Sequence, residues 1–76
     1  MANSRRSPIL EALDSESYEY LQIAFPDLLT AIEKEVGNGL KPDQVMRLVL
    51  QAVGPDRQAL AYRCLQAAHY IAKTQG

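Results

Sequence analysis

The chain of 76 residues contains a single cysteine, Cys64, and a single histidine, His69. A thiolate–imidazole pair needs both side chains within hydrogen-bond reach. A spacing of five residues puts these two on different sides of a helix. Two such ligands are also too few for a structural zinc site. We therefore expect no nucleophilic cysteine and no bound metal, and we interpret Cys64 as a small buried apolar residue.

The carboxylates do not form a catalytic pattern either. Glu33 and Glu35 lie two residues apart, and Glu11 and Asp14 lie outside any predicted pocket. General acid–base catalysis needs a carboxylate whose surroundings shift its pKa, so we expect these acids to form a solvated surface. The sequence also lacks a glycine-rich phosphate loop and the G-x-S-x-G, H-E-x-x-H and Ca²⁺-loop patterns. No enzyme activity and no cofactor are expected.

The best candidate for function is a polar and aromatic face of the last predicted helix. Tyrosine, arginine and histidine commonly anchor protein interfaces, because they combine a large contact area with a polar tip. The alternative is a solvated helix face whose tyrosines lie over neighbouring apolar surface. The candidate partner-binding residues of this face are Tyr62, Arg63, Gln66, His69, Tyr70 and Lys73.

Tyr20 and Ile23 form a second candidate for partner binding. If one helix runs through Pro26, both residues fall on the side opposite its apolar stripe, where they are free to contact a partner. If the helix instead ends before Pro26, we expect Ile23 to join the core.

A nucleic-acid-binding regulator is the alternative function. It would require residues 42–53 and 55–73 to form a helix-turn-helix, with base-contacting residues at the start of the second helix. Those residues would be Arg57, Gln58, Tyr62 and Arg63. The Gly54-Pro55 junction is shorter than the usual turn of such a motif. Asp43 and Asp56 also lie beside the few basic residues, which weakens phosphate binding.

Self-association is expected from the composition. Hydrophobic residues make up 47% of the chain, which is more apolar surface than one small core can bury. The net charge of −1 divides unevenly, with −4 on residues 1–38 and +3 on residues 39–76, which can help two subunits pack antiparallel. Met46 and Leu50 widen the apolar arc of the third predicted helix and are the candidates for a homodimer contact.

The sequence favours a cytoplasmic protein. Its apolar runs are too short for a membrane span, and no apolar segment follows Arg5 and Arg6, as a secretory or twin-arginine signal would require. A lone thiol suits a reducing compartment. We therefore expect no membrane contact, and an unidentified protein partner.

The first half of the predicted domain depends on how Pro26 is interpreted. Ser7 and Pro8 form a helix start, and we predict a short helix over 8–14 with a new start at Ser15 or Ser17. A stripe of apolar residues then keeps helical phase across Pro26, which predicts one helix over 16–36, kinked at Pro26. A break at Ala24–Phe25 is the alternative. The stripe consists of Tyr18, Leu21, Phe25, Leu28, Leu29, Ile32 and Val36.

The second half is predicted from its glycines and prolines. Gly37, Asn38 and Gly39 end one helix. Helices are expected over 42–53 and 55–73, each beginning with proline and separated by Gly54. The last helix has a thin, alanine-rich side that lets neighbouring backbones approach closely. Together these elements predict an all-α fold: a disordered tail over 1–7 and one helical domain over 8–76.

Overall fold

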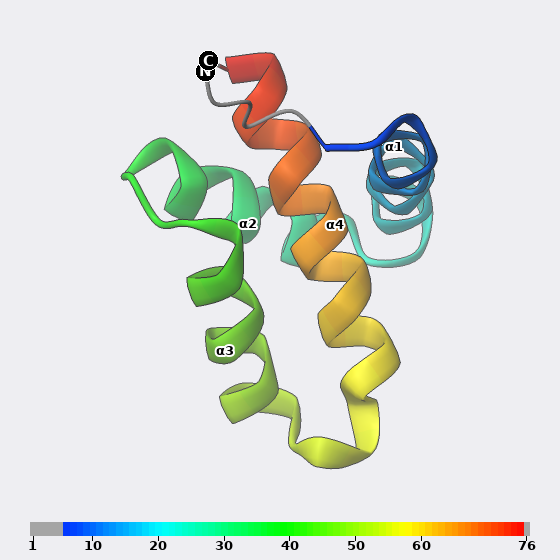
Figure 1. The fold of residues 1–76 in the computed structure, drawn as a ribbon. Helices are drawn as coiled ribbons and strands as arrows, with labels where there is room; N and C mark the ends of the chain where they lie inside the picture. Colours follow the sequence, from blue (N-terminus) through cyan, green and yellow to red (C-terminus); the bar gives the residue numbers. More distant parts are fainter. Residues whose placement is uncertain (1–5, 76) are drawn as a thin grey trace.

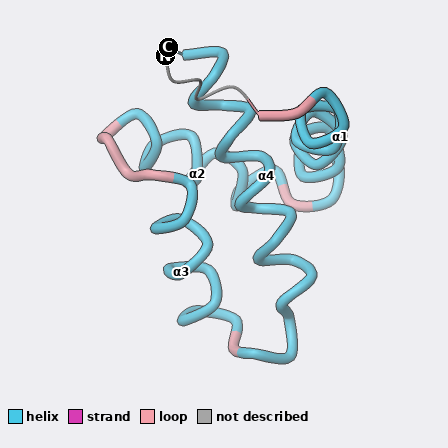
Figure 2. The backbone as a smooth tube through the Cα atoms, in the orientation of Figure 1, coloured by secondary structure: helices cyan, strands magenta, loops and turns pink. Residues whose placement is uncertain are grey.

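The computed structural model describes residues 6–75. Its α-helices are α1 (Pro8–Ala24), α2 (Pro26–Gly37), α3 (Pro42–Val53) and α4 (Gln58–Gln75), and a short 3-10 helix, η1 (Pro55–Arg57), connects α3 to α4. Figure 2 shows that only short loops separate them. No strand occurs over these residues, so the all-α class is confirmed.

The first helix is longer than the predicted segment 8–14. It begins as expected, because the Ser7 hydroxyl accepts a hydrogen bond from the Leu10 N–H at 3.3 Å and Pro8 takes the first helical position. No new helix starts at Ser15 or Ser17. The Ser17 hydroxyl donates to Gln66 Oε1 on α4 instead of capping a helix, and α1 continues through both serines to Ala24.

The boundary between the first two helices lies at Phe25, so the helix predicted over 16–36 is not continuous through Pro26. Phe25 has φ −142° and ψ 63°, and its N–H donates to the Leu21 carbonyl as the last bond of α1. Pro26, which has no N–H to donate, begins α2. Only one residue interrupts the helical backbone. Leu21 and Leu29 on the two sides of the break therefore both reach the core.

Helices α3 and α4 form an antiparallel hairpin (Figure 1). The bounds of α3 are those predicted. Gly54 ends this helix with φ +84°, a left-handed conformation that favours glycine, and its N–H donates to the Leu50 carbonyl at 2.8 Å. The predicted helix over 55–73 begins with the single turn η1 and extends to Gln75.

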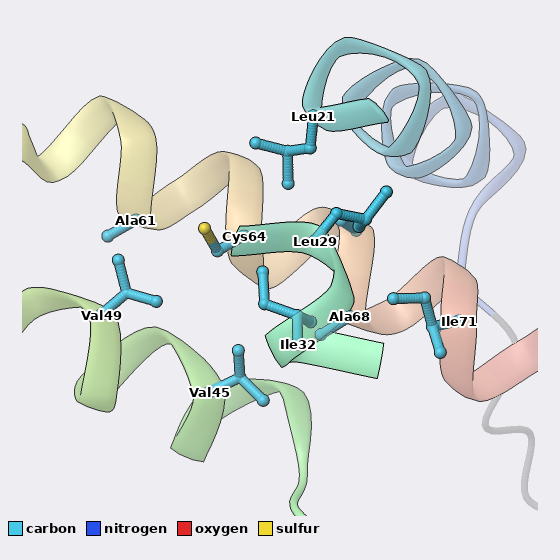
Figure 3. Close-up of a cluster of buried hydrophobic side chains, with 10 residues drawn as sticks. Leu21, Leu29, Ile32, Val45, Val49, Ala61, Cys64, Ala68 and Ile71 are labelled. Carbon is cyan, nitrogen blue, oxygen red and sulfur yellow. The ribbon is translucent and has the colours of Figure 1, made fainter. Parts of the chain in front are cut away.

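Helix α4 contacts each of the other three α-helices (Figure 1). Its alanine-rich side supplies half of the buried apolar residues, and the small side chains let the surrounding helices approach closely. Figure 3 shows side chains from all four helices converging beside this surface. The core consists of Leu21, Leu29, Ile32, Val45, Val49, Ala61, Cys64, Ala67, Ala68 and Ile71.

The predicted tail over 1–7 falls mostly outside the described residues, which begin at Arg6. Arg6 and Ser7 do contact the domain: Arg6 pairs with Asp14, and Ser7 caps α1. Over residues 6–75, none of the helices is both long enough and apolar enough to cross a membrane.

Candidate interaction site

Much of the polar face predicted on the last helix lies against α1. The Ser17 hydroxyl donates to Gln66 Oε1 at 2.5 Å. The rings of Tyr18 and Tyr70 stack with their centroids 4.7 Å apart and their planes tilted by 37°. Both contacts join α1 to α4, and both α4 residues are half-buried. Gln66 and Tyr70 therefore belong to an interface within the chain.

His69 and Lys73 also contact the N-terminal part of the chain. The Asp14 carboxylate, 3% exposed, accepts hydrogen bonds from Arg6 Nε at 2.8 Å and Nη2 at 3.1 Å. The remaining Nη1 lies 3.2 Å from His69 Nε2. Because a guanidinium only donates hydrogen bonds, His69 accepts this one as a neutral imidazole. Lys73 Nζ lies 3.5 Å from Glu11 Oε1, an exposed ion pair that adds little stability.

The pKa values of His69 and Tyr18 shift in the directions that these contacts require. Burial, followed by the nearby positive charge of Arg6, lowers the pKa of His69, and the carboxylates of Asp14 and Asp43 oppose that shift. The Tyr18 hydroxyl donates to Glu33 Oε2 at 3.0 Å, and this bond raises the pKa of Tyr18. It also ties α1 to α2.

Arg63 and Tyr20 lie in contact, although the sequence analysis assigned them to two different candidate partner-binding surfaces. The Arg63 guanidinium carbon lies 4.2 Å from the centroid of the Tyr20 ring, a cation–π contact between α4 and α1. The Phe25 ring lies 6.3 Å from Tyr20. Ile23, on the same side of α1 as Tyr20, is 85% exposed. The sequence predicted that Ile23 would join the core if the helix ended before Pro26. Helix α1 does end before Pro26, but Ile23 stays exposed, so that prediction is wrong.

A cavity of about 230 Å³ adjoins this contact, where the α1–α2 junction meets the start of α4. We call the cavity, together with Ile23 about one helical turn from Tyr20, the Tyr20–Arg63 surface. The residues that line the cavity are Tyr20, Phe25, Asp56, Arg57, Ala59, Leu60 and Arg63.

Tyr62, Met46 and Leu50 lie together at a different place. With Gln58 and Ala61 they line a small cleft of about 90 Å³ between α3 and α4. Tyr62 is 56% exposed, whereas Met46 and Leu50 are half-buried against the core. The proposal that Met46 and Leu50 contact a second subunit stays a prediction.

Cys64 lies fully inside the core, as the sequence indicated. Burial raises the pKa of its thiol to about 11, so it stays protonated at neutral pH and has little nucleophilic character. Over residues 6–75, no three side chains of the kinds that bind metal ions gather in one place.

Sequence reasoning missed the buried polar residues that hold α1 on α4. Asp14, Ser17 and Leu21 follow the three- and four-residue spacing of a buried helix stripe. That spacing could have indicated a buried side of the helix. Two of the three residues are polar, however, and the sequence analysis assigned Asp14 to a solvated surface and Ser17 to a helix cap. Arg6, the partner of Asp14, was assigned to the tail.

Comparisons with protein-family models, with curated proteins and with solved structures found no match to this chain.

Proposed function

We propose that this protein is a small, non-catalytic interaction domain that binds a protein partner through the Tyr20–Arg63 surface. One observation carries the proposal: Arg63 stacks on Tyr20 beside an open cavity, and Ile23, about one helical turn from Tyr20, is exposed. Tyrosine and arginine are enriched among the residues that dominate binding energy in interfaces. An exposed isoleucine adds apolar area that a partner can bury.

The contacts between α1 and α4 support this function by holding the surface in shape. The Tyr20–Arg63 contact joins two helices that are also linked by the Tyr18–Tyr70 stack. Arg6 adds a further link, because it pairs with Asp14 of α1 and hydrogen-bonds to His69 of α4. A surface whose side chains are already fixed loses less conformational entropy when a partner binds. We therefore expect the partner to bind without a change of fold.

The nucleic-acid alternative has less support than a protein partner. Helices α3 and α4 lie antiparallel, unlike the crossed helices of a helix-turn-helix. Arg57 and Arg63 share their cavity with Asp56, which reduces its attraction for phosphate. Binding to random duplex DNA that falls steeply with rising salt would favour this alternative over the proposal.

We also propose a cytoplasmic location. Its support is the single buried thiol, because a chain without disulfides suits a reducing compartment.

The test is to capture the partner from native cell extract and to measure its affinity for matched variants. We expect Arg63→Ala and Ile23→Ala each to weaken binding by about 2 kcal/mol, near thirtyfold. The matched controls are Lys34→Ala and Ile9→Ala, which remove an exposed base from α2 and an exposed isoleucine from α1, both outside the Tyr20–Arg63 surface. Equal losses in all four variants, or no loss in the first two, would contradict the proposal.

A further inference from the structure

An apolar groove of about 240 Å³ runs between α2 and α3. Its floor is formed by core residues, and it opens to solvent at Ala31, Leu48 and Ala52, which are exposed. Eight of its nine lining residues are apolar, and the ninth is Glu35. The lining residues are Leu28, Ala31, Ile32, Glu35, Val45, Leu48, Val49, Ala52 and Val53.

Leu48 forms the edge between this groove and a second, shallower depression on α3. It is 48% exposed, although it is a large apolar side chain. Arg47 is the charged residue of the second depression, whose other lining residues are Leu40, Gln44 and Gln51. The face therefore carries an acid on its α2 side, a projecting leucine near its centre and a base on its α3 side.

We propose that this face binds the same face of a second copy of the chain. In a two-fold dimer a patch meets itself, so each contact from one subunit is repeated by the other. Leu48 of one copy then enters the groove of the other, and Glu35 of each copy approaches the partner's Arg47. Neither Glu35 nor Arg47 forms an ion pair within residues 6–75, so both charges are free for this contact.

The second copy is favoured because the face is complementary to itself in both charge and shape. It offers an apolar groove and an apolar side chain to fill it, and an acid and a base on opposite sides. This dimer surface differs from the contact at Met46 and Leu50 that the sequence suggested, since those residues are half-buried toward α4. It is also separate from the Tyr20–Arg63 surface, so either proposal can fail without the other.

The dimer is expected to be weak. Helices α2 and α3 have twelve residues each, so the face is only ~18 Å long. A face of this length is expected to bury less than the ~800 Å² per subunit of a standard interface. We expect a dissociation constant of ~10 µM, as in a weak, transient dimer. The wild-type chain should be dimeric by sedimentation at ~200 µM and mostly monomeric at ~1 µM.

A charge exchange tests the arrangement directly. In the Glu35→Arg variant, the new arginine of each copy faces Arg47 of the other copy. In the Arg47→Glu variant, the new glutamate of each copy faces Glu35 of the other copy. Because like charges repel, each variant alone should self-associate about tenfold more weakly than the wild type. In an equimolar mixture every arginine faces a glutamate, and heterodimers should form at least as well as the wild-type dimer. The double variant Glu35→Arg/Arg47→Glu should also dimerise.

The Leu48→Glu variant is a second test, because it places a charge at the centre of the proposed dimer contact. Its control is Ile23→Glu, which places the same charge at another exposed apolar position. We expect Leu48→Glu to be monomeric at ~200 µM with wild-type helicity, and Ile23→Glu to dimerise normally. The charge exchange still decides the matter if Leu48→Glu does not fold. A monomeric wild type at this concentration, a dimer that Leu48→Glu leaves intact, or a mixture that stays monomeric would each overturn the proposal.

Discussion

Between α1 and α4, polar side chains pair with one another, as Ser17 does with Gln66 and Glu11 with Lys73. Between α2 and α3, apolar side chains line a groove that no other part of residues 6–75 fills. At the first contact Asp14 is buried and Tyr70 is half-buried. At the second, Leu48 is almost half exposed. A polar face is therefore internal in this protein, and apolar side chains are left at the surface. Residue type alone is a poor guide to which helix face is exposed.

The largest effect on stability should come from removing the buried carboxylate of Asp14. Asp14→Ala leaves the Arg6 guanidinium without its carboxylate and removes two charge-assisted hydrogen bonds. We expect a loss of about 3 kcal/mol in the free energy of unfolding, measured by urea denaturation. Glu16→Ala, an exposed acid on the same helix, should change it by less than ~0.5 kcal/mol. Similar values for the two variants would mean that Asp14 is solvated.

The next largest effect on stability should distinguish Tyr70 from Tyr62, both on α4. Tyr70→Ala removes the stack on Tyr18 and should cost about 2 kcal/mol of stability. Tyr62→Ala, at a mostly exposed position, should cost less than ~0.5 kcal/mol. The sequence predicts that both tolerate alanine, because it assigns them to one surface face. If thermal unfolding finds Tyr70→Ala neutral, α1 does not cover that face.

Pro26 sets the start of α2 and thereby one wall of the apolar groove. Pro26→Ala should lower the stability by about 0.5–1 kcal/mol, because proline at a first helical position restricts the unfolded chain without losing a hydrogen bond. Pro42→Ala, at the matching position of α3, should behave in the same way. A higher melting temperature for Pro26→Ala alone would mean that the helix runs through this position.

The smallest effect concerns pH and the contact between His69 and Arg6. Burial and Arg6 hold the pKa of His69 below its ordinary value of 6.5, so the unfolded chain binds a proton more readily than the folded one. The stability that neutral His69 contributes is therefore complete above pH 6.5 and is lost as the pH falls through the lowered pKa. Melting temperatures between pH 7.5 and 5 should fall less in His69→Gln than in wild type. Equal slopes would contradict this role.

The sequence was sufficient for the helical class, the bounds of α3, the cap at Ser7 and the apolar stripe. Each of these depends on residues close together in the chain. It was insufficient for the break at Phe25, because an interruption of one residue leaves the apolar phase intact. The roles of Ser17 and Arg6 were also hidden, since their partners Gln66 and His69 lie 49 and 63 residues away. Buried polar pairs of this kind have no local pattern.

The contact between Tyr18 and Tyr70 offers the most direct test of the difference between the two regions. Their ring centroids lie 4.7 Å apart, close enough for nuclear Overhauser effects between the ring protons of the free protein in solution. We predict strong cross-peaks between these two rings and none between the rings of Tyr62 and Tyr18. If the Tyr70 ring shows cross-peaks only to its own helix, the polar face of α4 is open to partners, and the assignment of that face to the interior is wrong.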